Sequence, residues 1–207
     1  MKRSRLRRGF YARPTLEVAS DLIGKVLVHD GPGGRAAGRI VEVEAYIGED
    51  DPACHAAPGP TKRNEPLYGP AGIAYVYLNY GVHYLTNIVT ESDGFPAAVL
   101  LRALEPVEGI PLMRRRRARS AGPEATRIDL HALCRGPGNL SKALGITLEQ
   151  NRLDVTRSAM SVEDWGLPSG DRAWSPRIGI RVGTDRVWRC YEVGNKAVSV
   201  RAVSVPE

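Results

Sequence analysis

Short runs of apolar residues divide the chain into segments separated by glycine, proline and charged residues. Strands are expected where apolar residues alternate or run for about four to eight positions, and helices where they recur every three or four. This pattern predicts two short helices, at 15–23 and 140–146. It predicts strands at 25–30, 36–46, 73–80, 83–89, 97–106, 177–183, 187–194 and 197–203.

The order of these elements indicates the fold class. Strands outnumber helices, and the two types do not alternate strictly along the chain, as they would around a parallel sheet. We therefore expect an α+β fold, with a largely antiparallel, curved sheet and a few helices in a single compact domain spanning 1–207. The basic residues 1–9 are expected to be disordered, and 114–127 to form a mobile basic loop.

The amino-acid composition indicates the cellular compartment in which the protein is expected. Apolar residues make up 43% of the chain and charged residues 25%, as in ordinary globular proteins. The longest apolar run is too short to span a membrane, and the basic N-terminus leads into no signal-peptide core. Cys54, Cys134 and Cys190 form no C-x-x-C pair, which favours reduced thiols over a disulfide framework or a zinc site. We expect a cytoplasmic protein.

A net charge of +6 favours a polyanionic partner. The run 114-RRRR-117 could bind phosphates, or it could lie solvated at a helix end or in a loop. In 136-GPGN-139 a helix start could direct backbone N–H groups at a phosphate, or simply turn the chain. The sequence leaves both choices open.

The segment 40-IVEVEAY-46 carries the residues for acid–base chemistry. Because side chains alternate along a strand, Glu42, Glu44 and Tyr46 share one face, and His55 follows in the next loop. A carboxylate near apolar walls can accept a proton from water, although a solvated strand face would look the same. Spacing does not say which glutamate matters. His55 lacks further ligands at metal-binding spacing, so we expect it to form hydrogen bonds in a pocket rather than bind a metal.

Half of the eight tyrosines occur within ten positions, at Tyr75, Tyr77, Tyr80 and Tyr84. One interpretation is a sheet face packed with aromatic rings. The other is nucleic-acid recognition, in which inward tyrosines stack on a base and Tyr80, just before a glycine, acts as a wedge. On the following strand, Asn87 could then contact a base edge.

Three motifs in order resemble the alkyladenine or 3-methyladenine DNA glycosylase family of single-domain type. They are 40-IVEVEAYIGEDDPACH-55, 75-YVYLNYGVHYLTN-87 and 97-AAVLLRALEP-106, and the resemblance extends from about residue 10 to 177-RIGI-180 and the last strands. It implies a monofunctional enzyme that excises damaged purines from double-stranded DNA by hydrolysing the N-glycosidic bond. It also implies that the reaction uses neither metal nor organic cofactor. One basic face and single-site chemistry suit a monomer, and DNA binding would associate the protein with the nucleoid.

The resemblance also implies roles for individual residues around a water molecule. The second glutamate of E-x-E-A-Y is the general base, which here is Glu44. Arg102 matches the arginine that helps to hold the water. The main-chain carbonyl of Ile178 matches a third contact to that water.

Further roles implied by the resemblance concern the damaged base. Tyr46 and His55 match residues that hold the flipped base, and Tyr77 stacks on its other face. Asn87 matches the asparagine that disfavours the exocyclic amino group of guanine. Tyr80 matches the intercalating tyrosine.

Two other functions remain as alternatives. One is a damaged-DNA-binding scaffold without activity, although the presence of the whole site set argues against it. The other is a nuclease, which would need a cluster of acidic metal ligands that the sequence lacks. Among 3-methyladenine, 7-methylguanine, hypoxanthine and ethenoadenine, the sequence does not rank the substrates.

Overall fold

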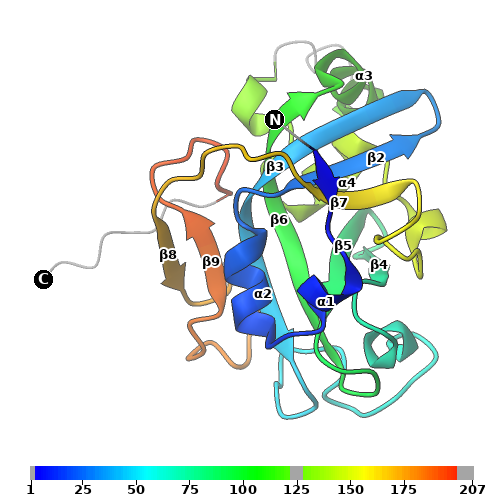
Figure 1. Ribbon diagram of the computed structural model, residues 1–207, viewed down its shortest axis with the longest axis vertical. Helices are drawn as coiled ribbons and strands as arrows, with labels where there is room; N and C mark the ends of the chain where they lie inside the picture. Colours follow the sequence, from blue (N-terminus) through cyan, green and yellow to red (C-terminus); the bar gives the residue numbers. More distant parts are fainter. Residues whose placement is uncertain (1–2, 122–127, 200–207) are drawn as a thin grey trace, which may run out of the picture.

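Nine strands form one sheet within residues 3–121 and 128–199, which are those that the computed structural model describes (Figure 1). The strands are β1 (Ser4–Arg5), β2 (Val26–Gly31), β3 (Gly34–Ile47), β4 (Ala74–Asn79), β5 (His83–Val89), β6 (Ala97–Glu108), β7 (Met160–Asp164), β8 (Arg172–Ser175) and β9 (Arg189–Glu192). The α-helices are α1 (Arg8–Tyr11), α2 (Thr15–Leu22), α3 (Ile110–Ala121) and α4 (Pro137–Leu144). The 3-10 helices include η1 (Glu65–Tyr68), η3 (Leu130–Ala132) and η4 (Leu148–Gln150).

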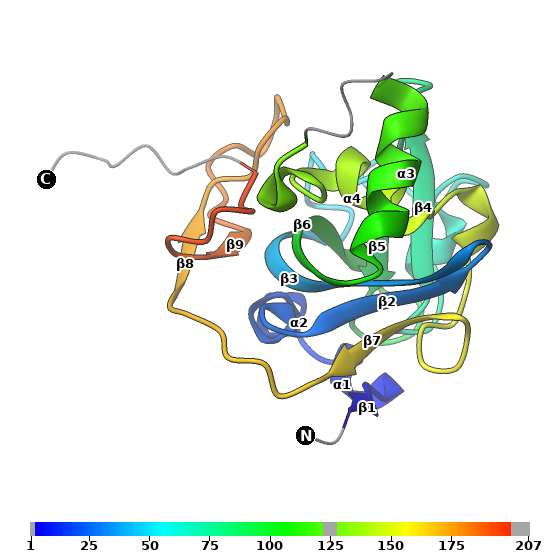
Figure 2. The ribbon, with the colours of Figure 1, turned by 90° about the horizontal axis from the view of Figure 1, so that it is seen from above.

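The strands pair in the order β1-β7-β2-β3-β6-β5-β4, and every pairing in the described part of the chain is antiparallel. Strand β9 adds to β3, and β8 adds to β9. In Figure 2 the β8–β9 ladder stands beside the curved main sheet. The predicted α+β fold around an antiparallel sheet is confirmed.

The longest strand, β3, carries the glutamates and changes partner along its length. Residues 34–39 pair with β2, and 42–44 pair with β9, while β6 follows β3 on the opposite edge throughout. The register with β6 shifts on both sides of Glu42. Such bulges bend a strand and redirect its side chains. The register shifts of β3 therefore lie at Glu42, in the part of the strand whose acidic side chains point into the molecule.

Helices α2 and α4 cover the main core. Val18 and Leu22 of α2, and Leu140 and Leu144 of α4, are fully buried in one hydrophobic cluster with strand residues. Figure 1 shows α2 lying along β3, with which it is in contact. Helix α4 packs against β5, where the hydroxyl groups of Thr86 and Ser141 lie 2.9 Å apart.

No helix in the described part of the chain has the length and apolar character that crossing a bilayer requires.

The N-terminal segment is ordered from residue 3, contrary to the prediction that 1–9 is disordered. Ser4–Arg5 pairs with β7, and Arg8 forms an ion pair of 2.6 Å with Asp154. These basic residues bind acidic groups that lie more than a hundred positions away, which local sequence does not reveal. Residues 1–2 lie outside the described part.

The prediction of a mobile loop at 114–127 is also partly wrong. Residues 114–121 continue helix α3, while 122–127 lie outside the described residues. The arginine run is fixed because Arg114 donates to the carbonyl of Ile128 at 2.5 Å, and Arg116 donates to that of Leu144 at 2.8 Å. Arg117 donates to the carbonyl of Leu133.

The strand predicted at 177–183 is a loop. Gly179 and Gly183 have φ angles of +76° and +62°, in the left-handed region that ends an extended strand. The strand predicted at 187–194 is present in its central part as β9. The prediction at 197–203 is wrong for 197–199, which follow β9 as a turn and a bend, and 200–203 lie outside the described residues.

Candidate active site

A cavity of about 440 Å³ opens beside the ends of β4 and β5. Its volume lies within the range of small-molecule sites, about 300–1,000 Å³. The cavity collects residues from strands β3, β4, β5 and β6, from η1 and α4, and from turns and loops that are distant in sequence. Its lining includes the predicted residues Tyr46, His55, Tyr77, Tyr80, Asn87, Arg102 and Ile178.

Glu44 lies behind this lining with 0% of its surface exposed. Its Oε2 accepts a hydrogen bond of 2.9 Å from the Tyr46 hydroxyl and lies 3.1 Å from Nη1 of Arg102. Its Oε1 accepts a hydrogen bond of 2.7 Å from the backbone N–H of Ile178. Three donors from two strands and a loop thus fix the carboxylate against the cavity wall. The observed Ile178 contact uses its N–H; the role of its carbonyl stays a prediction.

Arg102 on β6 connects Glu44 to the other glutamate of β3. Its Nε donates to Oε1 of Glu42 at 3.0 Å, while Nη1 faces Glu44. Burial opposes the charge of this guanidinium, but the two carboxylates outweigh burial and raise the pKa of Arg102. The cavity therefore keeps a permanent positive charge beside Glu44.

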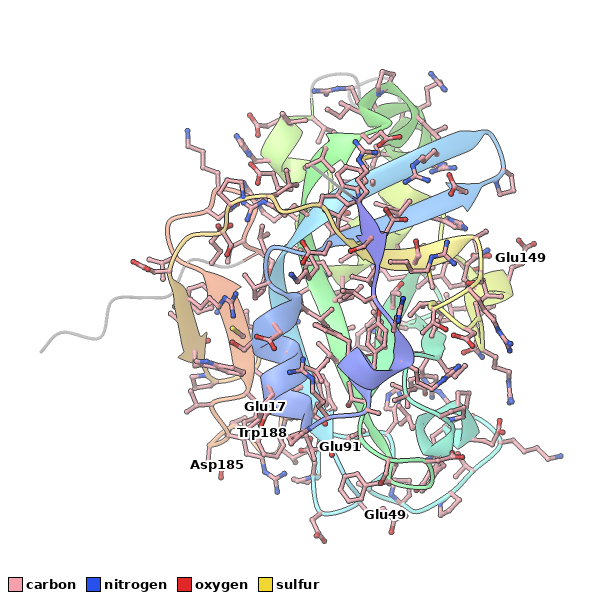
Figure 3. The ribbon with its side chains drawn as sticks, in the orientation of Figure 1. Glu17, Glu49, Glu91, Glu149, Asp185 and Trp188 are labelled. Atoms are coloured by element: carbon pink, nitrogen blue, oxygen red, sulfur yellow. The ribbon has the colours of Figure 1, made fainter. Side chains whose placement is uncertain are left out.

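Tyr46 forms part of the cavity wall, with its polar hydroxyl directed at Glu44 and the Arg177 guanidinium over its ring. Burial and the neighbouring Glu44 raise the pKa of Tyr46, so the phenol stays neutral and donates to the carboxylate. The guanidinium carbon of Arg177 lies 4.6 Å from the Tyr46 ring centroid and 5.1 Å from that of Trp188, labelled in Figure 3. Arg177 is held by Asp51 at 2.5 and 2.8 Å, with both side chains fully buried.

His55, Tyr75 and Tyr77 form an aromatic cluster that lines the cavity. The His55 ring lies 4.5 Å from Tyr77 between centroids, and its Nδ1 is 2.8 Å from the Tyr75 hydroxyl. Burial and the nearby Arg63 lower the pKa of His55, so the imidazole is neutral near pH 7. Burial also raises the pKa of Tyr75 to about 12. The cluster thus offers neutral ring faces to the cavity.

Asn87 and Tyr80 occupy opposite environments. Asn87 on β5 is buried, and its Nδ2 donates to the Tyr75 carbonyl at 2.9 Å, which fixes the amide at the cavity wall. Tyr80, in the turn between β4 and β5, is 86% exposed at the cavity mouth. The sequence placed both correctly: Tyr80 at a projecting turn and Asn87 on the adjacent strand.

A family model for methylpurine-DNA glycosylases matches residues 9–196 of the chain. The chain belongs to the methylpurine-DNA glycosylase family. The family predicted from the three motifs is thereby confirmed, and with it membership among the DNA glycosylases, hydrolases of DNA repair.

Curated relatives of this glycosylase span nearly its whole length. A protein of Methanocella arvoryzae is 50% identical over 201 residues, which cover 95% of this chain and 96% of the relative. One of Clostridium acetobutylicum is 44% identical over 200 residues, covering 95% and 98%. One of Bradyrhizobium diazoefficiens is 45% identical over 198 residues, covering 94% and 90%. Each is provisionally named a 3-methyladenine DNA glycosylase.

Four charged residues around the glycosylase site were not singled out from the sequence. Asp51 and Arg177 support Tyr46, Arg63 lies 5.6 Å from the Tyr77 ring centroid, and Arg189 donates to Glu42 at 2.7 Å. Asp51 and Arg177 lie inside the motifs quoted from the sequence, 40–55 and 177–180, and that position was the available signal, whereas Arg63 lies outside the quoted motifs. Arg189 is brought in by the β3–β9 pairing, which local patterns do not predict.

Among the described residues, no three His, Cys, Asp or Glu side chains gather as a set that could hold a metal ion.

Proposed function

We propose that this protein is a monofunctional DNA glycosylase that extrudes damaged purines from duplex DNA and hydrolyses their N-glycosidic bond. The observation that carries the proposal is Glu44, a fully buried carboxylate held by Tyr46, Arg102 and the N–H of Ile178 at the wall of an aromatic cavity. The provisional names of the relatives, 3-methyladenine DNA glycosylases, point to the same chemistry.

Recognition begins at the cavity mouth. An exposed aromatic ring can fill the gap left when a nucleotide leaves the stack, and Tyr80 is placed to do so. Extrusion costs a few kcal/mol and is cheapest for damaged pairs, which gives selectivity before chemistry begins. The resemblance implied that His55 and Tyr77 lie on opposite faces of the base, but their ring centroids are only 4.5 Å apart, which leaves no room for a base between them. The extruded base therefore enters between Tyr46 on one side and the His55–Tyr77 cluster on the other, where its ring is stacked. Asn87 lies at the base edge and disfavours the exocyclic amino group of guanine.

The hydrolytic step uses Glu44 as general base. A water molecule beside the carboxylate attacks C1′ of the extruded nucleotide and gives its proton to Glu44. The new C1′–O bond forms as the C1′–N bond breaks, and the bonding electrons leave with the base. The sugar gains oxocarbenium character on the way, and the carboxylate stabilises that developing positive charge. By analogy with inverting glycosidases, water attack from the face opposite the base inverts C1′.

The proposed substrates share weakened base pairing or a weakened glycosidic bond. An alkylated purine such as 3-methyladenine or 7-methylguanine is cationic and leaves as a neutral base. Hypoxanthine and ethenoadenine pair poorly and are therefore more easily extruded. The neutral rings of Tyr46 and Tyr77 can stack on any of these bases.

The test is an excision assay with Glu44→Gln. Duplexes carrying one hypoxanthine or one ethenoadenine, and methylated DNA, are incubated with chelator, and abasic sites are read after alkaline cleavage. We expect Glu44→Gln to reduce the excision rate by at least about 100-fold, because a general base contributes about 10² to 10⁴ in rate. Affinity for the same DNA should persist. Glu149→Gln, at the exposed helix η4 (Figure 3), is the matched control and should retain the wild-type rate.

The alternatives give different results in the same assay. A scaffold without activity would bind damaged DNA but release none of the bases. A nuclease would cut strands without alkali, and chelator would abolish the cutting. Either result would contradict the proposed glycosylase reaction.

A further inference from the structure

A second fully buried carboxylate lies on β3, two residues before Glu44. Glu42 is 0% exposed, like Glu44, and is not one of the residues that line the cavity. Its Oε1 accepts hydrogen bonds from Nε of Arg102 at 3.0 Å, Nε of Arg189 at 2.7 Å and the Ser199 hydroxyl at 2.7 Å. Its Oε2 accepts the backbone N–H of Ser199 at 2.6 Å. Of the partners of Glu42 only Arg102 lines the cavity, whereas all three partners of Glu44 line it. Glu42 therefore lies further from a bound base and an attacking water than Glu44 does.

Glu42 nevertheless reaches the reaction centre through Arg102. One end of that guanidinium binds Glu42, the other lies 3.1 Å from Glu44, and Nη2 is 3.4 Å from the Ser199 hydroxyl. A planar guanidinium held at both ends has a fixed orientation, whereas one held at a single end can rotate. The direction in which Arg102 presents its charge at Glu44 therefore depends on Glu42.

Ser199 reaches Glu42 because the 195–199 segment is packed onto the sheet. Ala197 is fully buried and Val198 nearly so, in a cluster with Val41 of β3 and Ala103 of β6. The family model ends at residue 196, so this donor lies beyond the part of the chain that the family comparison covers. The 195–199 segment thus contacts β3, which carries both glutamates, at a position outside the cavity.

The charges around Glu42 are balanced. Burial alone would raise the pKa of Glu42, but the guanidiniums of Arg102 and Arg189 outweigh burial and lower it. Two carboxylates, Glu42 and Glu44, thus face two guanidiniums. If Glu42 were neutral, Arg102 would be drawn wholly to Glu44 and would occupy carboxylate oxygen that the attacking water needs.

We propose that Glu42 and Ser199 are positioning residues for base excision, which hold the Arg102 guanidinium in the orientation that leaves Glu44 able to bind and deprotonate water. This proposal rests on the glycosylase reaction proposed above. Neither residue touches the substrate, so both act on the chemical step and not on the binding of the base.

The test compares excision with binding in four full-length variants. Excision is followed in single turnover, with enzyme in saturating excess over whichever of the three substrates the wild type cleaves. Binding is measured as Kd for the same duplex carrying an uncleavable abasic-site analogue. The variants are Glu42→Gln, Ser199→Ala, Ser199→Thr and Glu192→Gln.

Glu42→Gln should lower the single-turnover rate by about 10- to 100-fold, the size of effect that a small displacement of a reacting group produces. Its Kd should change by less than about 3-fold, since the cavity lining is intact. Ser199→Ala should lower the rate by a smaller factor, and Ser199→Thr, which keeps the hydroxyl, should restore it. Glu192→Gln removes a comparably buried carboxylate, bound to Arg39 at 2.7 Å, and should leave the rate unchanged.

Three outcomes would overturn the proposal. Glu42→Gln could excise at the wild-type rate. Glu42→Gln and Glu192→Gln could lose rate equally, or rate and affinity could fall together, which would indicate a purely structural role. If Glu42→Gln does not fold, the pair Ser199→Ala and Ser199→Thr decides, because equal rates in the two would contradict the role of the hydroxyl. A wild type without excision would contradict the glycosylase reaction itself, whereas each of the other results would contradict positioning alone.

Discussion

At Tyr80 the chain keeps a large aromatic residue in a backbone conformation that such residues rarely adopt. Its φ angle is +48°, and Gly81 follows at +70°. The left-handed conformation costs a residue with a side chain about 1–2 kcal/mol, which glycine or asparagine would largely avoid. With 86% of its surface exposed, Tyr80 recovers little of this through burial. A strained and exposed aromatic ring beside a cavity indicates a residue retained for binding.

Replacing Tyr80 separates binding from stability. Tyr80→Ala should weaken the Kd for a lesion-containing duplex by about 5- to 150-fold, because stacking on a base contributes about 1–3 kcal/mol. Its Tm should stay close to wild type, since little of the side chain is buried. Fluorescence polarisation and thermal unfolding measure the two quantities. Tyr80→Phe keeps the ring and should bind like wild type. An unchanged Kd in Tyr80→Ala would show that the ring does not enter the DNA.

The two glutamates of β3 show what residue spacing can and cannot predict. Alternation placed Glu42 and Glu44 on one face, and both are fully buried there. Their different surroundings come from residues distant in sequence: Glu44 meets Ile178, and Glu42 meets Arg189 and Ser199. The spacing of residues along one strand does not predict these distant partners. The choice of Glu44 as general base came from the family motif alone, and it stays a prediction.

At the scale of elements, the arginines of helix α3 connect this helix to neighbouring segments through hydrogen bonds. Arg114 donates to the carbonyl of residue 128 and Arg117 to those of 132–133, near η3, while Arg116 donates to those of 143–144 at the end of α4. Carbonyls at the end of a helix lack partners within it, and a cation there also complements the helix dipole. The two options left open by the sequence, a phosphate site and a solvated run, did not include this binding to carbonyls of the protein itself. Arg115, in contrast, is exposed.

Neighbouring arginines in this run should therefore differ in their effect on stability. Arg116→Ala removes donors to Pro32, Ala143 and Leu144 and should lower the free energy of unfolding by about 1.5–3 kcal/mol, the contribution of hydrogen bonds from a charged group. Arg115→Ala should change it by less than about 0.5 kcal/mol, as surface substitutions usually do. Urea unfolding of both variants measures this. Equal losses in the two would contradict the supporting role of Arg116.

Elements with strong local patterns were predicted well, and those made by distant contacts were not. The helix at 15–23, the β2–β3 hairpin and strands β4 to β6 follow from apolar periodicity and turn residues. Strand β7 was missed because it is defined by pairing with β2 and with the N-terminal β1. The loop at 177–183 has the alternation of a strand, but Arg177 is drawn to Asp51 and the chain turns at two glycines.

Over the whole molecule, buried acids are matched to arginines from distant segments. Glu42 lies between Arg102 and Arg189, and Arg39 on β3 binds Glu192 on β9 with two hydrogen bonds of 3.0 and 2.7 Å. Burial opposes ionisation of both carboxyls, but the paired guanidiniums outweigh it and lower the pKa of Glu42 and of Glu192. Much of the positive charge of the chain is thus used inside the molecule.

This arrangement predicts two stages of acid destabilisation. The pKa of His55 is lowered below 6.5 in the folded state, so the unfolded chain binds a proton there that the folded chain does not. Stability should therefore fall as the pH drops below about 6.5. Glu42 and Glu192 stabilise the fold above pH 4.5, which is the ordinary pKa of their side chains. This stabilisation is lost as the pH falls below 4.5, because the pKa values of both groups are lower in the folded state.

Urea unfolding at a series of pH values between about 8 and 3 measures both stages. Glu192→Gln, which cannot titrate, should reduce the acid stage and leave the stage near pH 6.5 unchanged. His55→Gln should do the opposite. A free energy of unfolding that is flat from pH 7 to 4 would contradict the lowered pKa of His55.

The contact between Ser199 and Glu42 has a consequence for how the protein is made. A ribosome releases Glu42 and Arg102 well before Arg189 and Ser199, which are 147 and 157 positions beyond Glu42. Until those donors emerge, burying Glu42 would leave a charge without its partners, which is strongly unfavourable. The reaction centre therefore becomes ordered late in synthesis, after the strands around it. If the proposed glycosylase reaction holds, a chain that ends before Ser199 should therefore excise bases more slowly than the 207-residue chain.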